Sequence, residues 1–445
     1  MTKKLIALAA ASVLLFALSS VCFAKPELSV NGWYRVRGHF YGNIDLDKDT
    51  TGPGAKDRSY WEQKFVMNPV LKVTDSITIL ARIRALDMVW GYNDMPYGLT
   101  FEGQCLPGGA RNPDDPNANF TWDRLWAMIS LGKYGTVNIG RQNTELFHNY
   151  FVSAEDTYGR VSWMIWPVPN QVLAGLLYDK RGEGDIDNMN DGEKTHWCPW
   201  FMIFQEKWTF GYVHSWFIEY QAAGRVHNHF NDAMLNAKLG PVDMKSEFTY
   251  TFGEASPGVD ITDSFSMFAD LSVPLEGPVN KVSLLFSYFQ GYDKDTNVSW
   301  PGLLGSNVDW VDDWEIDLIL FNQILGRVIN AIVIRPRVDI TIPGAEQWGV
   351  YVSALYAMAS QEAQYQPYYP NATPGWGNLP VNNGTGATLT ATDDKGMGFE
   401  VDVGIKYALA ENSDVVLGVG YFAPGKYFVG EDPCLGIELQ TMVRF

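Results

Sequence analysis

Strict alternation of apolar and polar residues is the feature that most constrains how this chain can fold. In residues 242–252 every second side chain is apolar except Ser246, and the side chains between them are polar. Residues 397–409 repeat the pattern, from Met397 to Leu409. A period of two places successive side chains on opposite faces of a strand. Each of these segments is therefore predicted to be a strand with one apolar face and one polar face.

The composition agrees with two-faced strands rather than with long apolar runs. Hydrophobic residues make up 46% of the 445 residues, aromatic residues 14% and charged residues 19%, yet the mean hydropathy is −0.12. This aromatic content excludes a disordered chain. Beyond residue 24 no run approaches the roughly 20 apolar residues that a transmembrane helix needs. The net charge of −18 argues against non-specific binding to nucleic acid.

The first 24 residues have the pattern of a secretory signal peptide. Lys3 and Lys4 precede an apolar run over residues 5–18, and small residues lead to Ala24. We predict cleavage near Ala24, which leaves residues 25–445 as a single domain. One disulfide could form among the later cysteines, and the sequence does not indicate its partners; these cysteines are Cys105, Cys198 and Cys434.

The connections between these segments are alternately short and long. Eight short turns each join a pair of strands, and a first and a last strand bring the number to about eighteen, with sixteen as the alternative. The turns fall near residues 74–76, 132–135, 168–169, 206–207, 240–241, 276–278, 343–344 and 411–413. The long connections are rich in Gly, Pro, Asn and Asp, at residues 42–57, 91–119, 181–195, 293–310 and 360–396.

Short turns on one rim and long loops on the other are typical of a transmembrane β-barrel. A soluble β-sandwich would also alternate, but the signal peptide, the single long run of strands and the few cysteines favour the barrel. Lipid cannot satisfy an open sheet edge, so the sheet must close. The predicted fold is an all-β, closed antiparallel transmembrane barrel with short periplasmic turns and long external loops.

One segment, residues 309–326, departs from the period of two. Its apolar residues follow the 3, 4, 3, 4 spacing of a helix, from Val311 to Leu325. We expect a short helix in an external loop before a strand at residues 328–342. The alternative is another strand with a frayed start.

The last strand carries the sharpest signal for a family. Residues 435–445 alternate and stop at Phe445, which resembles the C-terminal strand of Gram-negative outer-membrane proteins, where a final Phe is the signal for barrel assembly. Residues 400–425 resemble the penultimate hairpin of the alginate-export-like and homotrimeric porin group of sulfate- and metal-reducing bacteria. This resemblance implies a passive outer-membrane channel that forms a homotrimer.

Strand parity places a set of basic residues on the water-facing side of the barrel. Pairs two residues apart occur at residues 35–37, 82–84 and 335–337. A channel selects through the residues that line its narrowest section, so we expect a basic pore lining. An ordinary polar lumen wall is an equally weighted explanation. The candidate pore-lining residues are Arg35, Arg37, Arg82, Arg84, Arg124, Arg335 and Arg337, with Lys64 and Lys72 on the same face.

The connection at residues 143–159 is the candidate constriction loop. It has the place of the third external loop, which general porins fold into the pore. Its acidic residues would then face the wall arginines and create a transverse field across the pore; they are Glu145, Glu155 and Asp156.

Other constellations give weaker signals. The acidic run at residues 185–193 lacks the ligand order of a calcium loop, which favours a solvated loop. His227 and His229 could chelate a metal, but exposed histidines are commoner. His214 and Ser215 are adjacent and so lie on opposite strand faces, which disfavours a hydrolytic pair. We therefore assign no catalytic residue, metal or cofactor.

The sequence favours a non-enzymatic porin for small hydrophilic solutes and ions. The expected partners are outer-membrane lipid and lipopolysaccharide, the barrel-assembly machinery and two further copies of the chain. The alternatives are a conduit for an acidic polysaccharide, a sheath for a multihaem cytochrome, or an adhesive barrel that works through its loops. The chain has no CxxCH motif, so any haem would belong to a partner.

Overall fold

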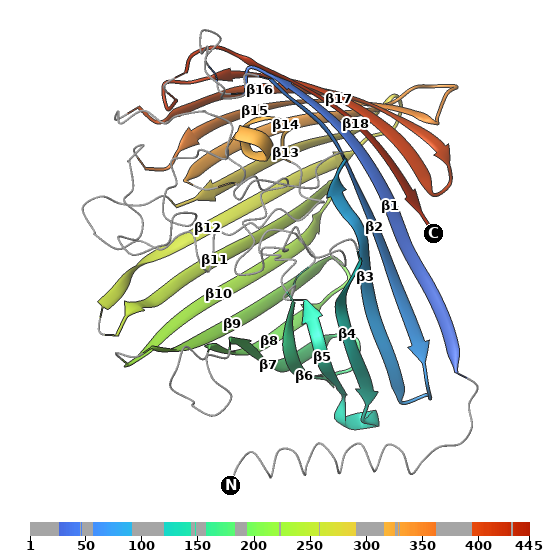
Figure 1. Ribbon diagram of the computed structural model, residues 1–445, viewed down its shortest axis with the longest axis vertical. Helices are drawn as coiled ribbons and strands as arrows, with labels where there is room; N and C mark the ends of the chain where they lie inside the picture. Colours follow the sequence, from blue (N-terminus) through green and yellow to red (C-terminus); the bar gives the residue numbers. More distant parts are fainter. Residues whose placement is uncertain are drawn as a thin grey trace.

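The described part of the chain forms one antiparallel sheet of 18 strands, as the alternation predicts. The computed structural model describes residues 26–44, 46, 57–90, 120–143, 147, 157–182, 194–221, 224–257, 259–290, 316–324, 328, 330–361, 394–428 and 430–445. The sheet curls round until its first and last strands meet (Figure 1). The predicted closed barrel is thereby confirmed.

The strands follow the chain order round the barrel, each paired with its neighbours in sequence. Their bounds are β1 Glu27–Gly42, β2 Asp57–Lys72, β3 Ile77–Val89, β4 Phe120–Ser130, β5 Thr136–Asn143, β6 Thr157–Val168, β7 Val172–Gly182, β8 Lys194–Phe204, β9 Trp208–Gln221, β10 Gly224–Leu239, β11 Val242–Ser256, β12 Val259–Pro274, β13 Val279–Phe289, β14 Ala331–Thr341, β15 Trp348–Ala359, β16 Gly396–Ala410, β17 Ser413–Pro424 and β18 Cys434–Arg444. The described residues also contain a 3₁₀ turn, η2 (Gly132–Tyr134), and a π-helical turn, η3 (Leu320–Ile324).

The eight predicted short turns coincide with eight connections on one rim of the barrel. Positive φ angles at Gly240 (65°) and Gly344 (75°) explain why glycine occupies two of these turns. On the other rim two connections are also short, because β9 ends at Gln221 and β10 begins at Gly224, while β11 ends at Ser256 and β12 begins at Val259.

The barrel closes where β18 pairs with β1. Beyond the strand end, Phe445 and Gly32 exchange two backbone hydrogen bonds, with N···O distances of 2.9 and 3.0 Å. A Cβ at Gly32 would lie 2.2 Å from the carbonyl oxygen of Val66 and 2.8 Å from the ring of Phe445. Phe445 also stacks on Phe65 of β2 with ring centroids 5.8 Å apart. The C-terminal residue therefore packs across the seam onto β1 and β2.

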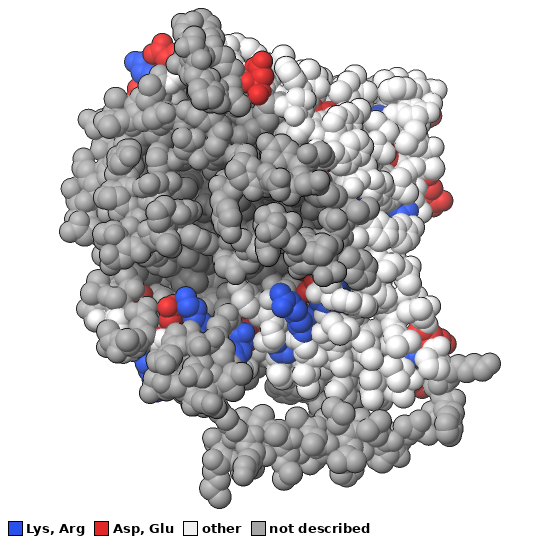
Figure 2. Space-filling view, in the orientation of Figure 1, with Lys and Arg blue, Asp and Glu red and all other residues white. Residues whose placement is uncertain are grey.

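Alternation divides each strand into an outward apolar face and an inward face. On β16 the side chains of Phe399, Val403 and Ile405 are 39–43% exposed, whereas Glu400 and Asp402 between them are buried. Figure 2 shows mostly uncharged surface at the right of the view, where β1, β2 and β18 lie in Figure 1. Among the described residues, no helix is long and apolar enough to span a membrane.

Candidate functional site

Six basic side chains on β1–β4 form one patch of the inner wall, which we call the basic wall: Arg35, Arg37, Lys64, Arg82, Arg84 and Arg124. Arg37 donates to Glu62, its cross-strand partner. Arg35 lies opposite Lys64 in the register, and like charges at that distance repel. Trp33 lies beside both cations, with its ring centroid 5.5 Å from Arg35 and 5.9 Å from Lys64, which offsets part of the repulsion.

His39 extends the basic wall toward the seam with β18. Its Nε2 lies 3.4 Å from Glu62, and its Nδ1 lies 3.4 Å from Glu438 of β18. The imidazole also stacks on Tyr60 with ring centroids 4.5 Å apart. His39 thus lies between carboxylates of the two strands that flank β1.

Three arginines of the basic wall contact a single carboxylate, that of Asp123. Arg84 Nη2 lies 2.8 Å from Asp123 Oδ1, Arg82 Nε lies 3.4 Å from Oδ2, and Arg124 Nε lies 3.7 Å from Oδ2. The register explains the convergence, because Arg82 pairs with Arg124 whereas Ile83 pairs with Trp122. Asp123 is therefore the extra residue of a β-bulge. Strict alternation would place Asp123 and Arg124 on opposite faces, so the sequence did not reveal this contact.

A second buried ion pair, also missed at the sequence level, lies further round the wall on β6–β8. Asp179 is 0% exposed and accepts from Arg160 Nη2 at 2.8 Å. The ring of His196 contacts the same carboxylate through Nδ1 at 2.9 Å. Arg160 Nη1 donates to the carbonyl of Asn143 at 2.6 Å. This arginine therefore fixes the end of β5, where the connection at residues 143–159 begins.

The structure does not bring Arg335 and Arg337 to the basic wall. Both lie on β14, which is separated from β1 by β15–β18. Arg337 forms an ion pair with Asp339 at 2.7 Å. Its guanidinium carbon lies 4.1 Å from the ring centroid of Tyr351. Arg335 donates to the carbonyl of Ile316 at 2.8 Å. The two arginines therefore form a separate group that contacts part of the β13–β14 connection.

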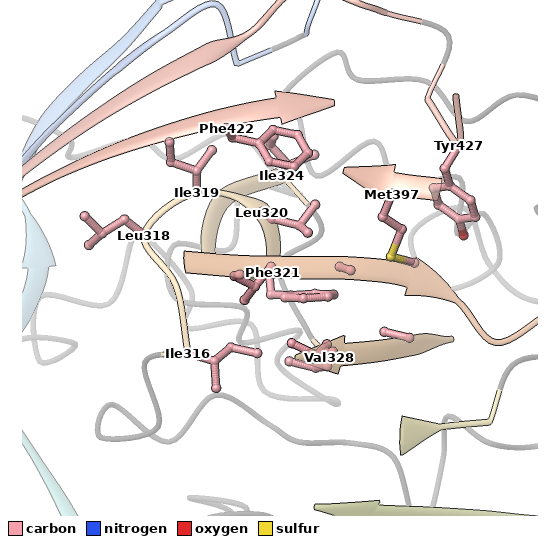
Figure 3. Packing of buried hydrophobic residues seen from close by; sticks show 14 of the residues in the cluster. Ile316, Leu318, Ile319, Leu320, Phe321, Ile324, Val328, Met397, Phe422 and Tyr427 are labelled. Atoms are coloured by element: carbon pink, nitrogen blue, oxygen red, sulfur yellow. The ribbon is translucent and has the colours of Figure 1, made fainter. Parts of the chain in front are cut away.

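Residues 316–324, which we call the inner segment, lie against the inner wall. Ile316, Ile319, Leu320 and Phe321 are each 0–1% exposed. They pack in one apolar cluster with inward side chains of β12–β18 and β1, including Phe268, Leu285, Val333, Leu355, Met397, Phe422, Cys434 and Tyr41. In Figure 3, Ile319, Leu320 and Phe321 of the segment can be seen with Met397 and Phe422 of the strands.

Glu400 of β16 anchors the backbone of the inner segment. Its carboxylate accepts the N–H groups of Leu318, Ile319 and Leu320, each at 2.9 Å. Asp317 caps the following turn by accepting from the N–H groups of Phe321 and Asn322 at 3.1 and 3.2 Å. Burial, followed by the negative charge of Asp402, raises the pKa of Asp317 to about 7.

Three glycines of β17 and β18 make room for the inner segment. A Cβ at Gly436 would lie 2.9 Å from Ile319, one at Gly418 would lie 3.1 Å from Leu318, and one at Gly420 would lie 3.2 Å from Ile319. Gly418 and Gly420 alternate with Leu417, Val419 and Tyr421, which are 39–49% exposed on the outward face. Glycines at inward positions of a strand thus indicate an inner surface without side chains. The apolar run in residues 316–324 indicates that this segment is buried.

The helix expected at residues 309–326 can be compared with the structure over residues 316–324 only; residues 309–315 and 325–326 lie outside the described residues. Within that range η3 is a π-helical turn. Although it belongs to the connection between β13 and β14, it lies inside the barrel rather than outside it (Figure 1). Burial of its apolar side chains explains this placement.

The acidic residues expected in the constriction loop, Glu145, Glu155 and Asp156, lie outside the described residues. Within residues 143–159, Phe147 is described and is 6% exposed. It packs with inward side chains of β7–β10, namely Leu177, Cys198, Val213 and Met234. A Cβ at Gly211 would lie 2.4 Å from its ring. This connection therefore contacts the inner wall at Phe147.

The two described cysteines are not joined to each other. Cys198 of β8 and Cys434 of β18 are both buried. They belong to different apolar clusters, that of Phe147 and that of the inner segment. Cys105 lies outside the described residues.

The fold has many solved relatives, although neither a protein-family model nor a curated protein sequence matches this chain. A BenF-like porin from Pseudomonas fluorescens Pf-5 gives a TM-score of 0.54 at 10% identity, over 94% of this chain and 99% of that one. Pseudomonas aeruginosa OccK5 (OpdH) gives a TM-score of 0.52 at 10% identity, over 94% of this chain and 98% of that one. The Pseudomonas aeruginosa outer membrane protein opdK gives 0.51 at 9% identity, over 94% and 98%. These similarities establish that the chain has the fold of outer-membrane porins.

Proposed function

We propose that this chain is a Gram-negative outer-membrane porin that gives small hydrophilic solutes and ions a passive route through its lumen. The observation that supports the proposal is the division of the barrel into an apolar outer face and an inner wall lined with charged side chains. Such a barrel satisfies its backbone within lipid and keeps a polar interior for water. The porins among its structural relatives have the same architecture.

We further propose that the basic wall gives the channel a preference for anions. Basic side chains outnumber carboxylates on β1–β4, where Asp123 alone faces three arginines. The excess positive charge raises the local concentration of anions in a confined lumen. The inner segment and the Phe147 connection narrow the same lumen, which brings solutes closer to the wall.

The inner segment makes the conduit and sheath alternatives less well supported than a diffusion channel. A sheath around a cytochrome, or a route for a polysaccharide, needs an interior that is open along its length. The inner segment packs on inward side chains of β12–β18 and β1, so it takes up interior space that either cargo would use. A diffusion channel for small solutes tolerates such a segment.

The route of the chain to the membrane is part of the proposal. Residues 1–24 would direct export and be removed near Ala24, and Phe445 would be recognised by the barrel-assembly machinery. In the outer membrane the apolar outer face would contact lipid and lipopolysaccharide. Three copies would associate as a homotrimer, as the resemblance to homotrimeric porins implies.

Liposome swelling with neutral sugars of graded size tests the proposed function. We expect fast swelling with small sugars and a sharp size cutoff. Bilayer recordings in a salt gradient should show stepwise conductance and a reversal potential of the sign that anion preference gives. A correctly folded barrel that produced neither swelling nor conductance would contradict the porin proposal, and native gel mobility of unboiled protein reports the trimer.

A further inference from the structure

The outer face of β5–β7 changes from apolar to basic toward the rim with the long connections. Ile139 of β5 and Val161 of β6 are cross-strand partners that face outward, and they are 39% and 46% exposed. Arg141 lies two residues beyond Ile139 and is exposed. Because side chains alternate along a strand, Arg141 shares this outward face. The apolar band of this part of the barrel therefore ends between Ile139 and Arg141.

Lys180 of β7 brings a second cation to the same row of the sheet. The register pairs Arg141 with Gly159 of β6, and Gly159 with Lys180. Leu177 and Asp179 are 2% and 0% exposed and alternate with each other's neighbours: Asp179 faces inward, so Lys180 faces outward. Neighbouring strands lie about 4.7–4.9 Å apart, which places the Cα atoms of Arg141 and Lys180 about 10 Å from each other. Both side chains are long enough to converge above Gly159.

Gly159 leaves space between the two cations. It is exposed, and a Cβ at this position would meet no described atom within 4 Å apart from its chain neighbours. The Nε atom of Arg141 donates to the hydroxyl of Thr157 at 2.7 Å, which orients the guanidinium. In the described part of the chain, no carboxylate forms an ion pair with Arg141. Its two Nη groups can therefore donate to an anion above Gly159.

The position of this row along the barrel puts it at the level of lipid headgroups. β5 has 8 residues, fewer than the about 9–11 that a strand needs to cross the hydrocarbon. A short apolar stretch thins the bilayer around it. Tyr178, two residues from Lys180, packs against Trp197 with ring centroids 4.7 Å apart, and aromatic side chains mark the membrane interface. The headgroups of the external leaflet should therefore reach Arg141 and Lys180.

We propose that Arg141 and Lys180 bind a phosphate group of a lipopolysaccharide in the external leaflet, with the phosphate above Gly159. A guanidinium donates two parallel hydrogen bonds to phosphate, and an ammonium adds a point charge. The acyl chains of the same molecule would lie on the apolar face at Ile139 and Val161. A free phosphate ion would make no such apolar contact. The inference rests on the proposed location in the outer membrane, which supplies this lipid.

Native mass spectrometry of the folded barrel in a neutral detergent tests the site, with diphosphoryl lipid A as the probe. We expect one lipid to bind the unchanged chain, and at least tenfold weaker binding in R141Q/K180Q. The control K133Q/K207Q removes two exposed cations from the turn rim and should bind within twofold of the unchanged chain. Diacylglycerol, which has acyl chains but no phosphate, should bind at least tenfold more weakly than lipid A, and so should inorganic phosphate.

G159L tests the geometry of the site without changing its charge. Gly159 does not belong to the glycines with a positive φ, so the strand accepts a leucine at this position. The new side chain would occupy the space between Arg141 and Lys180. We expect G159L to bind lipid A at least tenfold more weakly than the unchanged chain.

Slower gel migration after boiling serves as the folding control for each variant. Equal affinity for lipid A in folded R141Q/K180Q and in the unchanged chain would overturn the proposal, and so would equal losses in R141Q/K180Q and K133Q/K207Q. Inorganic phosphate that bound as tightly as lipid A would overturn the assignment to a lipid. Undiminished binding in G159L would overturn the position of the phosphate. Liposome swelling is an independent measurement, so loss of the lipid site with normal swelling would leave the porin proposal intact.

Discussion

One carboxylate, Glu400, satisfies three consecutive backbone N–H groups of the inner segment. In E400A these buried donors lose their acceptor, and each orphaned donor costs about 1–3 kcal/mol. We therefore expect the inner segment to leave the wall for part of the time. Single-channel recordings should show a larger mean conductance and more frequent current steps than the unchanged chain.

The matched control for E400A is E411A, since Glu411 lies exposed in the turn between β16 and β17. This variant removes a carboxylate from the same hairpin without touching the inner segment. Equal conductance in E400A, E411A and the unchanged chain would contradict the anchoring role of Glu400.

The attachment of the inner segment to the wall should depend on pH through the carboxyl group of Asp317. Its pKa is raised to about 7 in the folded barrel, first by burial and then by Asp402, whereas an unfolded Asp titrates near 3.9. Between these values the attached segment binds more protons than the free segment, so the contribution of Asp317 to attachment is lost as pH rises from about 4 to about 7. Current fluctuations should be more frequent at pH 8 than at pH 5.

The D317N variant separates this effect from other titrations. An amide at position 317 can still accept from the N–H groups of Phe321 and Asn322, but it does not ionise. We expect the difference between pH 5 and pH 8 to shrink in D317N. A pH response identical to that of the unchanged chain would assign the effect to other groups.

At the scale of elements, the glycines of β17 and β18 let the inner segment lie flat on the wall. In G436V the new side chain would overlap Ile319 and Tyr41, whose nearest atoms lie 2.9 and 3.0 Å from a Cβ at this position. Overpacking of this kind costs about 1–3 kcal/mol. We expect G436V to loosen the segment and to raise the mean conductance, as E400A does.

G349A is the control for this prediction, because a Cβ at Gly349 would meet its nearest atom at 3.7 Å, an ordinary contact. It adds a methyl group to β15 without touching the inner segment. A folded G436V barrel with the conductance of G349A would show that the glycine surface does not set the position of the segment.

The strands and their eight short turns could be predicted because alternation and turn chemistry act locally. The inner segment could not be placed in the same way, since a helical spacing in residues 309–326 does not say which side of the barrel a loop occupies. The bulge at Asp123 was hidden for a related reason, because strand parity assumes that no extra residue interrupts the strand. Parity predicts that the arginines at residues 35–37 and 82–84 face the water-filled side, but it could not predict their carboxylate partners, which depend on the register between strands.

At the scale of the whole molecule, the basic wall should set the ion preference of the channel. In R82Q/R84Q the positive charge around Asp123 falls, and the remaining pair there is Asp123 with Arg124. We expect the reversal potential in a KCl gradient to move toward cation preference. The shift should be larger at 0.1 M than at 1 M salt, because the screening length falls from about 10 Å to about 3 Å.

K133Q is the control for ion preference, since Lys133 lies exposed in η2 on the turn rim. It removes one positive charge from the molecule but none from the basic wall. If R82Q/R84Q left the reversal potential where K133Q leaves it, the arginines of β3 would have no part in selectivity.

The apolar cluster around the inner segment reaches from Phe268 on β12 to Tyr41 on β1 and includes Cys434 on β18, so it crosses the line where the first and last strands meet. A barrel that opens sideways at β1 and β18 would have to pull this cluster apart as well as break the backbone pairs of the seam. The segment can reach its place only after the strands have come together, because the surface on which it sits does not exist before then. We therefore expect the segment to hold the closed barrel together, to add a late step to folding and to slow the first step of unfolding.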